Sequence, residues 1–374
     1  MKIFLFDMDG VLLESHGYYF ALQETIRSIG KTLGFRDATI TIEDISTFEA
    51  GGINNEWDEA AICTALLLEI AWKIDPKQDL PEIPAPVSSP AISIIPDFKC
   101  LALELSSPEL INIHPLSRAK DRFLSSNHLS NAQQIIIKKL IAEARNPSQS
   151  ITHRIFQELV LGSSEFSHAY GMPARLNCES YLCKYDAPNL SRSESENLEN
   201  YIYSTGKSAV IVTSRPCKNP DILFSTPEAE MGADLVGFKN IPIVGWGGIT
   251  WLAEQCKVDP QTIVKPSAIH ALAALRVALG DDQKKALVGS AKLVDAKDGA
   301  DAWKQLDGAQ VSIYEDTPGG ITSLQEAQKI LAEHSIILET RYYGIASNPI
   351  KREALRAVGA NLYPSISQAL SASM

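Results

Sequence analysis

Short apolar runs alternate with amphipathic helices along the second half of the chain. Four runs rich in β-branched or aromatic residues are bounded by polar residues or proline: 209–214 (AVIVTS), 262–266 (TIVKP), 309–316 (AQVSIYED) and 341–347 (RYYGIAS). Helical patterns follow the last three of them, at 267–280, 322–334 and 349–360. Buried strands in alternation with helices predict an α/β fold with a doubly wound parallel sheet.

The chain opens with a further run of this kind. Residues 2–6 predict a short buried strand, which is followed at once by two acids, Asp7 and Asp9, with Gly10 behind them. Aspartate and glycine often end strands because they suit turns. A binding site is the other explanation, since ligands of open α/β sheets bind just outside the carboxyl ends of the strands.

The intervening region reads as helical. Apolar residues recur at helical spacing at 16–35, 41–50, 54–74, 130–145 and 152–162. Six prolines between 76 and 96 exclude a regular helix there. We therefore expect an α/β core formed by 1–15 and 205–374, and a helical domain at 16–204 with an irregular, proline-rich insert at about 75–128.

Composition narrows the class of protein. The chain has 374 residues, 45% hydrophobic residues and a net charge of −11, so a large core is possible and electrostatics give no reason to expect a nucleic-acid or membrane partner. No apolar run reaches the ~18 residues of a membrane span, and Asp7 and Asp9 interrupt the first apolar run too early for a signal peptide. The six cysteines show no CxxC pair or zinc spacing, so we expect reduced thiols and a cytoplasmic location.

Polar side chains stand at the predicted carboxyl ends of four strands. They are Asp7, Thr213, Lys265, and Glu315 with Asp316. Each has an ordinary explanation of its own, as a turn residue, a solvated lysine or a helix cap. Because the carboxyl ends of parallel strands meet at one edge of a sheet, we expect these side chains to converge there.

The order of these residues resembles the motifs of the haloacid dehalogenase-like (HAD) hydrolase superfamily. DMDGVL (7–12) is similar to the first motif of that superfamily, AVIVTS to the second and IVKPS (263–267) to the third. YEDTPGGI (314–321) is similar to the fourth, in the acidic-pair form of β-phosphoglucomutase-like members. The resemblance covers about 1–75, 150–270 and 305–370, and it leaves out the proline-rich insert and the stretch 281–305.

The resemblance implies a fold and a metal. The fold is a HAD-like Rossmannoid core, three-layered α/β/α, with a helical cap inserted between the first two motifs; 51–60 and 156–171 resemble the cap of phosphoglycolate phosphatase-like members. The metal is Mg²⁺, held by Asp7, Asp316, the backbone carbonyl of Asp9, and Glu315 or waters. Two carboxylates ~4 Å apart repel by roughly 4 kcal/mol at an effective dielectric near 20, and a hard divalent cation suits an all-oxygen cluster.

The resemblance also implies catalytic roles. Asp7 would attack phosphorus and form an aspartyl-phosphate, while Asp9 would protonate the leaving oxygen and then activate the hydrolytic water. Thr213 would bond a phosphoryl oxygen, and Lys265 would neutralise charge beside it. Many relatives carry a further Asp four residues after the position of Asp316, where this chain has glycine, so the metal geometry is less fixed than the nucleophile.

Substrate contacts are harder to place. Asn54 and Asn55 of GGINNEW are candidates in the cap, and Ser214 and Arg215 follow the second motif. Helix capping explains the asparagines equally well, and solvation explains the arginine. A lid of helices would restrict the substrate to a small phosphorylated metabolite, and we expect a monomer or homodimer.

Three other functions remain open. A phosphosugar mutase of the β-phosphoglucomutase type would need a cap group that reorients a bisphosphate intermediate, and the sequence identifies none. A dehalogenase needs no metal and would have no use for Asp9 together with Glu315 and Asp316. A non-catalytic binding protein could retain the HAD-like fold.

Overall fold

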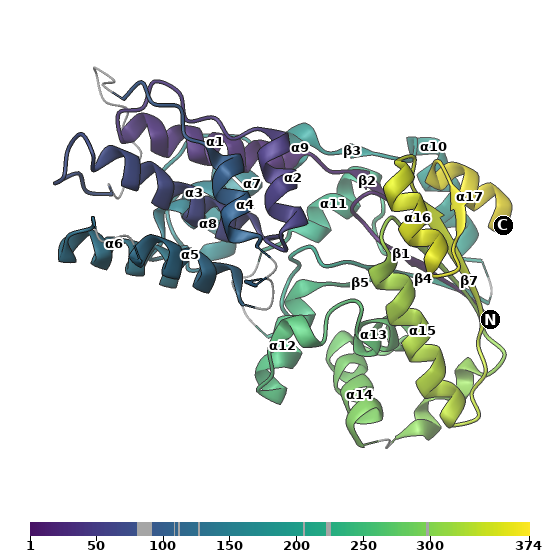
Figure 1. The fold of residues 1–374 in the computed structure, drawn as a ribbon. Helices are drawn as coiled ribbons and strands as arrows, with labels where there is room; N and C mark the ends of the chain where they lie inside the picture. Colours follow the sequence, from purple (N-terminus) through teal and green to yellow (C-terminus); the bar gives the residue numbers. More distant parts are fainter. Residues whose placement is uncertain are drawn as a thin grey trace. The chain divides into compact units, whose positions relative to one another are not determined.

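The computed structural model describes residues 1–80, 92–107, 109–110, 113–125, 128–204, 206–221, 226–296 and 299–374. Its contacts divide the chain into two compact units, drawn in Figure 1. Residues 1–15, 168–171 and 186–374 form the sheet unit, and residues 16–167 and 172–185 form the helical unit. The boundary predicted at 205 therefore moves to 186. The reason is that α10 (Arg192–Ile202) buries Leu198 and Ile202 against the sheet.

Six described strands form one parallel sheet in the sheet unit. Their order is β5 (Ile243–Val244), β4 (Lys207–Val212), β1 (Lys2–Phe6), β6 (Gln310–Glu315), β7 (Glu339–Ile345) and β8 (Asn361–Tyr363). The chain runs outward from β1 through β4 and β5, then returns to β6 on the other side of β1. The topological switch point therefore lies between β1 and β6, where ligands of open α/β sheets bind.

Helices cover both faces of this sheet, as Figure 1 shows. Ile3 and Leu5 of β1 face a core shared with α12 (Trp246–Cys256), α13 (Ala268–Ala278), α14 (Gln283–Ala296), α15 (Pro318–Glu333) and α16 (Pro349–Ala357). Phe4 and Phe6 face the opposite core, which α10, α11 (Glu228–Val236) and α17 (Ile366–Ser373) close. Alternate burial on two faces explains why β1 is apolar throughout. The predicted α/β class and parallel sheet are confirmed.

The strand predicted at 262–266 is wrong. Pro260–Thr262 form a 3₁₀ turn, η1, and the residues after it run as a loop toward α13. The β-branched residues favour a strand, but Asp259 caps the turn by accepting from the Gln261 N–H, and Ile263 and Val264 donate back to the Pro260 carbonyl. The strand beside β4 is instead the two-residue β5, which no sequence signal indicated.

A two-stranded pairing lies in the sheet unit where the chain leaves it and returns. β2 (Leu13–Glu14) pairs antiparallel with β3 (Ala187–Pro188). The Asn189 side chain donates to the Val11 carbonyl at 3.0 Å beside this pairing. These bonds connect the segment after β1 with the segment that precedes α10.

The helical unit packs around one buried helix. α3 (Glu56–Ala71) is buried along most of its length and contacts α1 (Gly17–Thr32), α5 (Pro115–Leu124), α6 (Asn131–Ala142) and α7 (Ile151–Leu161). α2 (Ile42–Ala50), α4 (Phe98–Leu105), α8 (Ser163–Tyr170) and α9 (Tyr181–Tyr185) are the other helices described between 16 and 185. Thr41 and Asp44 form a capping box at the start of α2. The helix expected at 152–162 is observed as α7, which ends at Leu161 with Gly162 as its cap.

The two stretches expected to be irregular or additional contain regular structure. α4 and α5 lie inside the expected irregular insert at 75–128, and the bulk of its proline-rich part, residues 81–91, lies outside the described residues. α14 and the 3₁₀ helix η2 (Ala300–Leu306) lie within 281–305. The proline-rich composition hid both helices. α4 begins at Phe98, just after the last of the six prolines, with Asp97 as its cap, and α5 begins at Pro115 with His114 as its cap, a position in the first turn that suits proline.

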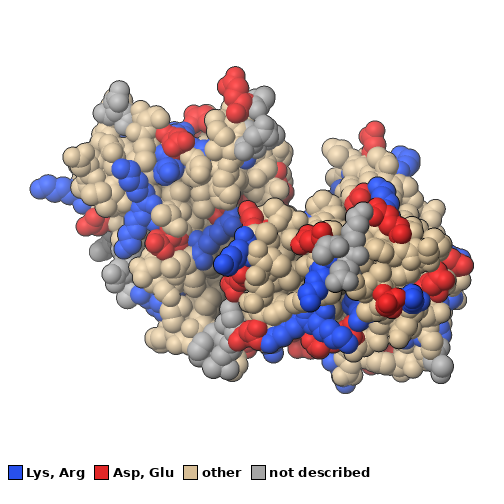
Figure 2. Space-filling view, turned by 90° about the horizontal axis from the view of Figure 1, so that it is seen from below, with Lys and Arg blue, Asp and Glu red and all other residues tan. Residues whose placement is uncertain are grey.

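The structure also bears on the expectations about the cysteines and about membrane spans. All six cysteines lie in the described part of the chain and are free. In that part, no helix combines the length and apolar character needed to cross a membrane. Figure 2 shows Lys and Arg side chains interspersed with Asp and Glu on one face.

Candidate active site

Three carboxylates meet at the switch point between β1 and β6. Asp7 follows β1, Glu315 is the last residue of β6, and Asp316 follows it. Each contributes an oxygen such that the three oxygens lie within 4.8 Å of one another, and all three residues are buried. The parallel register explains this, since Phe6 pairs with Tyr314 and the Asp7 N–H donates to the Tyr314 carbonyl at 2.9 Å. The predicted convergence of Asp7, Glu315 and Asp316 is therefore observed; we call them the acidic cluster.

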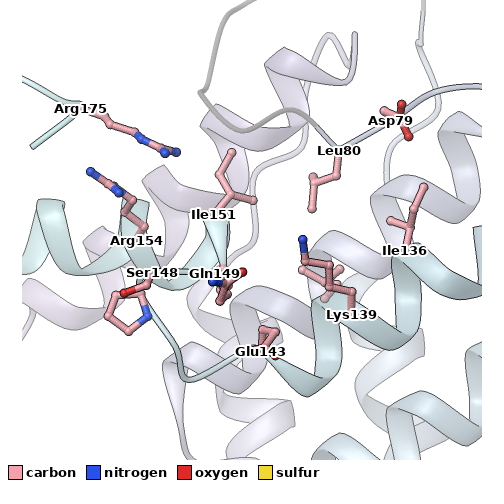
Figure 3. Close-up of a pocket in the computed structure, with 13 residues that line it drawn as sticks. Asp79, Leu80, Ile136, Lys139, Glu143, Ser148, Gln149, Ile151, Arg154 and Arg175 are labelled. Atoms are coloured by element: carbon pink, nitrogen blue, oxygen red, sulfur yellow. The ribbon is translucent and has the colours of Figure 1, made fainter. Parts of the chain in front are cut away.

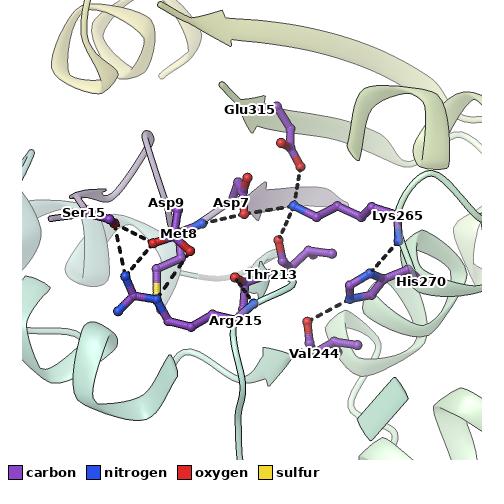
Figure 4. A network of polar contacts seen from close by, with 11 residues as sticks. Asp7, Met8, Asp9, Ser15, Thr213, Arg215, Val244, Lys265, His270 and Glu315 are labelled. Atoms are coloured by element: carbon purple, nitrogen blue, oxygen red, sulfur yellow. Dashed lines mark hydrogen bonds and ion pairs between the residues drawn. The ribbon is translucent and has the colours of Figure 1, made fainter. Parts of the chain in front are cut away.

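Lys265 reaches this cluster from a loop rather than from a strand. Its Nζ lies 2.9 Å from Asp7 Oδ1, donates to Glu315 Oε1 at 2.9 Å and donates to the Val212 carbonyl at 3.1 Å (Figure 4). All three ammonium donors are thus directed at oxygens. Lys265 therefore binds the ends of β1, β4 and β6 together.

His270, which sequence reasoning missed, positions the backbone of Lys265. Burial lowers the pKa of His270 to about 3, so its imidazole is neutral. Nδ1 accepts from the Lys265 N–H at 3.2 Å, and this leaves Nε2 to donate to the Val244 carbonyl at 3.0 Å. A histidine three residues into α13 carries no sequence signal for this role, because both partners are distant strand or loop backbone.

Burial and charge shift the pKa values of the cluster. Burial raises the pKa of Glu315 well above its usual range, and the neighbouring Asp7 carboxylate adds to the rise. Burial and Asp7 also raise the pKa of Asp316. Burial alone would lower the pKa of Lys265, but Asp7 and Glu315 outweigh it and raise the pKa. The lysine thus remains charged, and the raised pKa values of Glu315 and Asp316 reflect burial and the repulsion between neighbouring carboxylates.

A second lysine, Lys351 of α16, forms an ion pair with Asp316 Oδ2. Its side chain is 51% exposed, whereas that of Lys265 is 8% exposed. Nothing in the sequence around Lys351 distinguishes it from other surface lysines, so this contact was not predicted. Lys265 is thus a buried cation of the site, whereas Lys351 is largely exposed to solvent.

Two glycines make room for the acidic side chains. Gly10 has φ +76°, and a Cβ there would collide with the Asp316 carboxylate. A Cβ at Gly320 would collide with Glu315 Oε1 and its carboxyl carbon. The space beside residue 320 is therefore filled by the Glu315 carboxylate.

Replacing Gly320 with Ala should displace Glu315 from Lys265. We expect a loss of about 1–3 kcal/mol of unfolding free energy, as for other overpacked sites, together with weaker binding of divalent cations. Gly319→Ala is the matched control, because a Cβ there meets no atom closer than 3.8 Å. Equal stability and cation affinity in the two variants would contradict this account of Gly320.

Asp9 belongs to a different network in the same unit. Its carboxylate accepts from the Arg215 guanidinium and the Ser15 hydroxyl (Figure 4). Arg215 also pairs with Asp186 at 3.0 Å, and both of those side chains are fully buried. Burial acts to raise the pKa of Asp9, but Arg215 and the Ser15 hydrogen bond bring it below its ordinary value. The solvated state considered for Arg215 is therefore wrong, and Asp9 is held as a carboxylate.

The other predicted site residues belong to two different units of the chain. Thr213 follows β4, is buried, and its Oγ1 accepts from the Arg215 N–H at 3.0 Å. Ser214 is exposed beside it. Asn55 caps α3 in the helical unit by accepting from the N–H groups of Trp57 and Asp58, so capping accounts for its side-chain oxygen. Asn54 is exposed in the same unit.

Comparisons with known proteins support the fold. The chain is similar to a solved structure described as the X-ray structure of a Northeast Structural Genomics Consortium target. The match covers 100% of this chain and 98% of that chain, with a TM-score of 0.67 and 16% sequence identity. No protein-family model matches the chain, and no curated protein matches it significantly. At this identity the likeness shows the α/β fold alone.

The acidic cluster fits a hard divalent cation. Its donors are all carboxylate oxygens, which suit Mg²⁺ or Ca²⁺. Among the described residues, Glu315 Oε2 is buried without a hydrogen-bond partner, a costly state for a polar atom. A cation bound at the cluster would satisfy this oxygen. Asp9 would not contribute its carboxylate, since that group is held by Arg215 and Ser15.

Proposed function

We propose that this protein is a Mg²⁺-dependent phosphatase that hydrolyses a small phosphorylated metabolite through an aspartyl-phosphate on Asp7. The observation that carries the proposal is the buried acidic cluster at the switch point, with Lys265 ion-paired to both Asp7 and Glu315. The order of Asp7, Asp9, Thr213, Lys265 and the acidic pair along the chain, similar to the HAD superfamily, supports it further.

Asp7 is the nucleophile of the proposed reaction. Its Oδ1 accepts from the Met8 N–H at 2.8 Å and contacts Lys265, which orients the carboxylate and leaves Oδ2 for attack. In the first step Oδ2 forms a bond to phosphorus while the bond from phosphorus to the leaving oxygen breaks, and the leaving oxygen takes a proton that Asp9 has gained from solvent before this step. In the second step water attacks phosphorus, and inorganic phosphate and the Asp7 carboxylate are released.

Asp9 lies two residues further along and handles the protons. Because Arg215 and Ser15 favour its ionised form, its resting state suits removal of a proton from the hydrolytic water. Arg215 in turn is fixed by the buried Asp186. Arg215 therefore acts as a positioning residue that holds Asp9.

Charge at the site has to be balanced before a phosphate dianion can approach. Lys265 supplies one fixed positive charge. When bound, Mg²⁺ would supply the remainder and stabilise the charge that develops on the transferring phosphoryl group. The residues that would hold it are Asp7, Asp316 and Glu315. Glu315 fills the space beside Gly320, where many HAD relatives carry a further aspartate, and so takes the place of that missing ligand.

Removing divalent metal should abolish turnover. With p-nitrophenyl phosphate as substrate, we expect EDTA to lower activity by more than about 100-fold, since a bound metal contributes several kcal/mol of charge stabilisation. Added Mg²⁺ should restore the activity. Full turnover in the metal-free protein would contradict the proposal. If Mg²⁺ does restore activity, a panel of phosphorylated metabolites will identify the substrate class that the metal-loaded protein prefers.

A further inference from the structure

A cavity of about 410 Å³ lies within the helical unit (Figure 3). Its walls are the end of α6, the connection at 147–150, the first turn of α7, and the side chains of Asp79, Leu80 and Arg175. Cavities of this size are typical of sites for small organic ligands. No residue of the acidic cluster lines it.

Two arginine side chains lie together at one end of this cavity. Figure 3 shows Arg154 and Arg175 next to each other at that end, with Asp79 at the opposite end. Lys139 of α6 also lines the cavity. Among the described residues, no carboxylate lies within ion-pair distance of the Lys139 ammonium group. Glu158 offsets the charge of Arg154, and the charges of Arg175 and Lys139 favour an anion in the cavity.

A buried carboxylate holds the two arginine segments in place. Glu158 Oε1 accepts from Arg154 Nε at 3.0 Å, and Glu158 Oε2 accepts from the backbone N–H groups of Arg175 and Leu176 at 2.8 and 2.6 Å. Arg154 also donates to the Pro173 carbonyl at 2.5 Å and is only 9% exposed. Arg154 is therefore prearranged, and its position does not depend on a ligand.

The first turn of α7 adds to the positive end. Ser150 caps this 11-residue helix by accepting from the His153 N–H, and Ser150 and Ile151 both line the cavity. The amino end of a helix carries partial positive charge and favours anions. Glu143 is the nearby acid of the lining, and its carboxylate accepts from the Asn146 side chain.

The remaining wall is apolar. It is formed by Leu80, Ile136, Leu140 and Ile151. A ligand that filled the cavity would thus place an oxyanion group at one end and an apolar body along this wall. Guanidinium groups recognise phosphate and carboxylate by paired hydrogen bonds.

We propose that this cavity is a binding site for a small organic oxyanion, a phosphate or carboxylate, that is held by Arg154, Arg175 and Lys139. The site is composed of helical-unit residues only, so it does not depend on the function proposed for the acidic cluster. Its ligand class combines a negative group with an apolar body of a size that fits about 410 Å³.

Calorimetric titration of the full chain tests this site. The probes are phenylphosphonate and phthalate, which carry a phosphonate or carboxylates on an apolar ring. Divalent metal is removed beforehand on a chelating resin, because dissolved EDTA is itself a polycarboxylate of the proposed ligand class. We expect one of the two probes to bind with one molecule per chain, and the preferred probe identifies the oxyanion. Absence of heat from both probes at millimolar concentration would overturn the proposal.

Two substitutions locate the binding. Arg175→Met and Lys139→Met should each weaken the bound probe at least about tenfold, because each removes a charged hydrogen-bond donor. Both residues are exposed, so the variants should fold, which a thermal melt verifies. Lys138→Met is the matched control, since Lys138 lies next to Lys139 on α6 but does not line the cavity. Wild-type affinity in both test variants would place the binding elsewhere and overturn the proposal.

Discussion

Asp7→Asn will remove phosphatase turnover while the sheet unit stays folded. The amide has the same shape as the carboxylate but cannot attack phosphorus, so we expect kcat to fall by more than about 10³-fold, as for other nucleophile replacements. Asp7 donates its backbone N–H to the Tyr314 carbonyl, a contact that the substitution leaves in place. Steady-state kinetics with Mg²⁺ present measure the change.

The control for this variant is Asp301→Asn. Asp301 lies on η2 of the same unit, and its side chain is 89% exposed. It should retain wild-type kinetics. A folded Asp7→Asn protein with more than a tenth of wild-type activity would rule out Asp7 as the nucleophile.

Lys265→Met should have the largest effect on stability. The substitution leaves Asp7 and Glu315 buried without their shared cation, and breaking a buried ion pair costs about 3–5 kcal/mol. Denaturant unfolding measures the loss. Lys304→Met is the control, since its side chain is 73% exposed and surface substitutions usually change stability by less than about 0.5 kcal/mol.

A second variant separates charge from packing in this result. Lys265→Met combined with Glu315→Gln removes one of the two carboxylates and should recover part of the lost stability. Non-additivity of this kind is expected for groups in direct contact. The contradicting result is additivity. If the free energy of unfolding lost in the double variant equalled the sum of the losses in the two single variants, Lys265 and Glu315 would act independently and their ion pair would not stabilise the fold.

Local patterns predicted four of the six described strands of the sheet, and they gave no signal for β5 or β8. β1 was placed at its observed bounds, and β4, β6 and β7 within two residues, because each is a compact apolar run with clear polar limits. The run at 262–266 failed because the same β-branched residues can fill a core from a loop when a capped turn precedes them. Lys265 was nevertheless assigned to the right edge.

The convergence of the site was predictable for a physical reason. Parallel strands end at one edge, so residues just after β1 and β6 must be neighbours whatever the intervening chain does. Contacts between segments that are far apart in the chain could not be predicted in this way, because no local sequence pattern indicates them. Asp186, His270 and Lys351 each reach the site from segments whose sequence is ordinary.

The same limit explains the residues that changed role. The sequence shows that Arg215 follows Thr213 closely. Its ion pairs with Asp9 and Asp186 join residues that are far apart in the chain, so the sequence did not indicate them. In the sequence, Gly320 stands where the resembled motif often carries a further acid. The structure gives the reason for glycine, because Glu315 occupies the space that a side chain would need.

Trapping the phosphorylated enzyme tests the central claim most directly. The protein is mixed with Mg²⁺ and a substrate that carries a radiolabelled phosphoryl group, quenched in acid during turnover, and digested for peptide mass spectrometry. The account predicts label on the peptide that contains Asp7, its absence from the Asp7→Asn protein, and loss of the label from wild-type peptide in hydroxylamine, as for an acyl phosphate. Turnover without label on that peptide, or label on another residue, would contradict it.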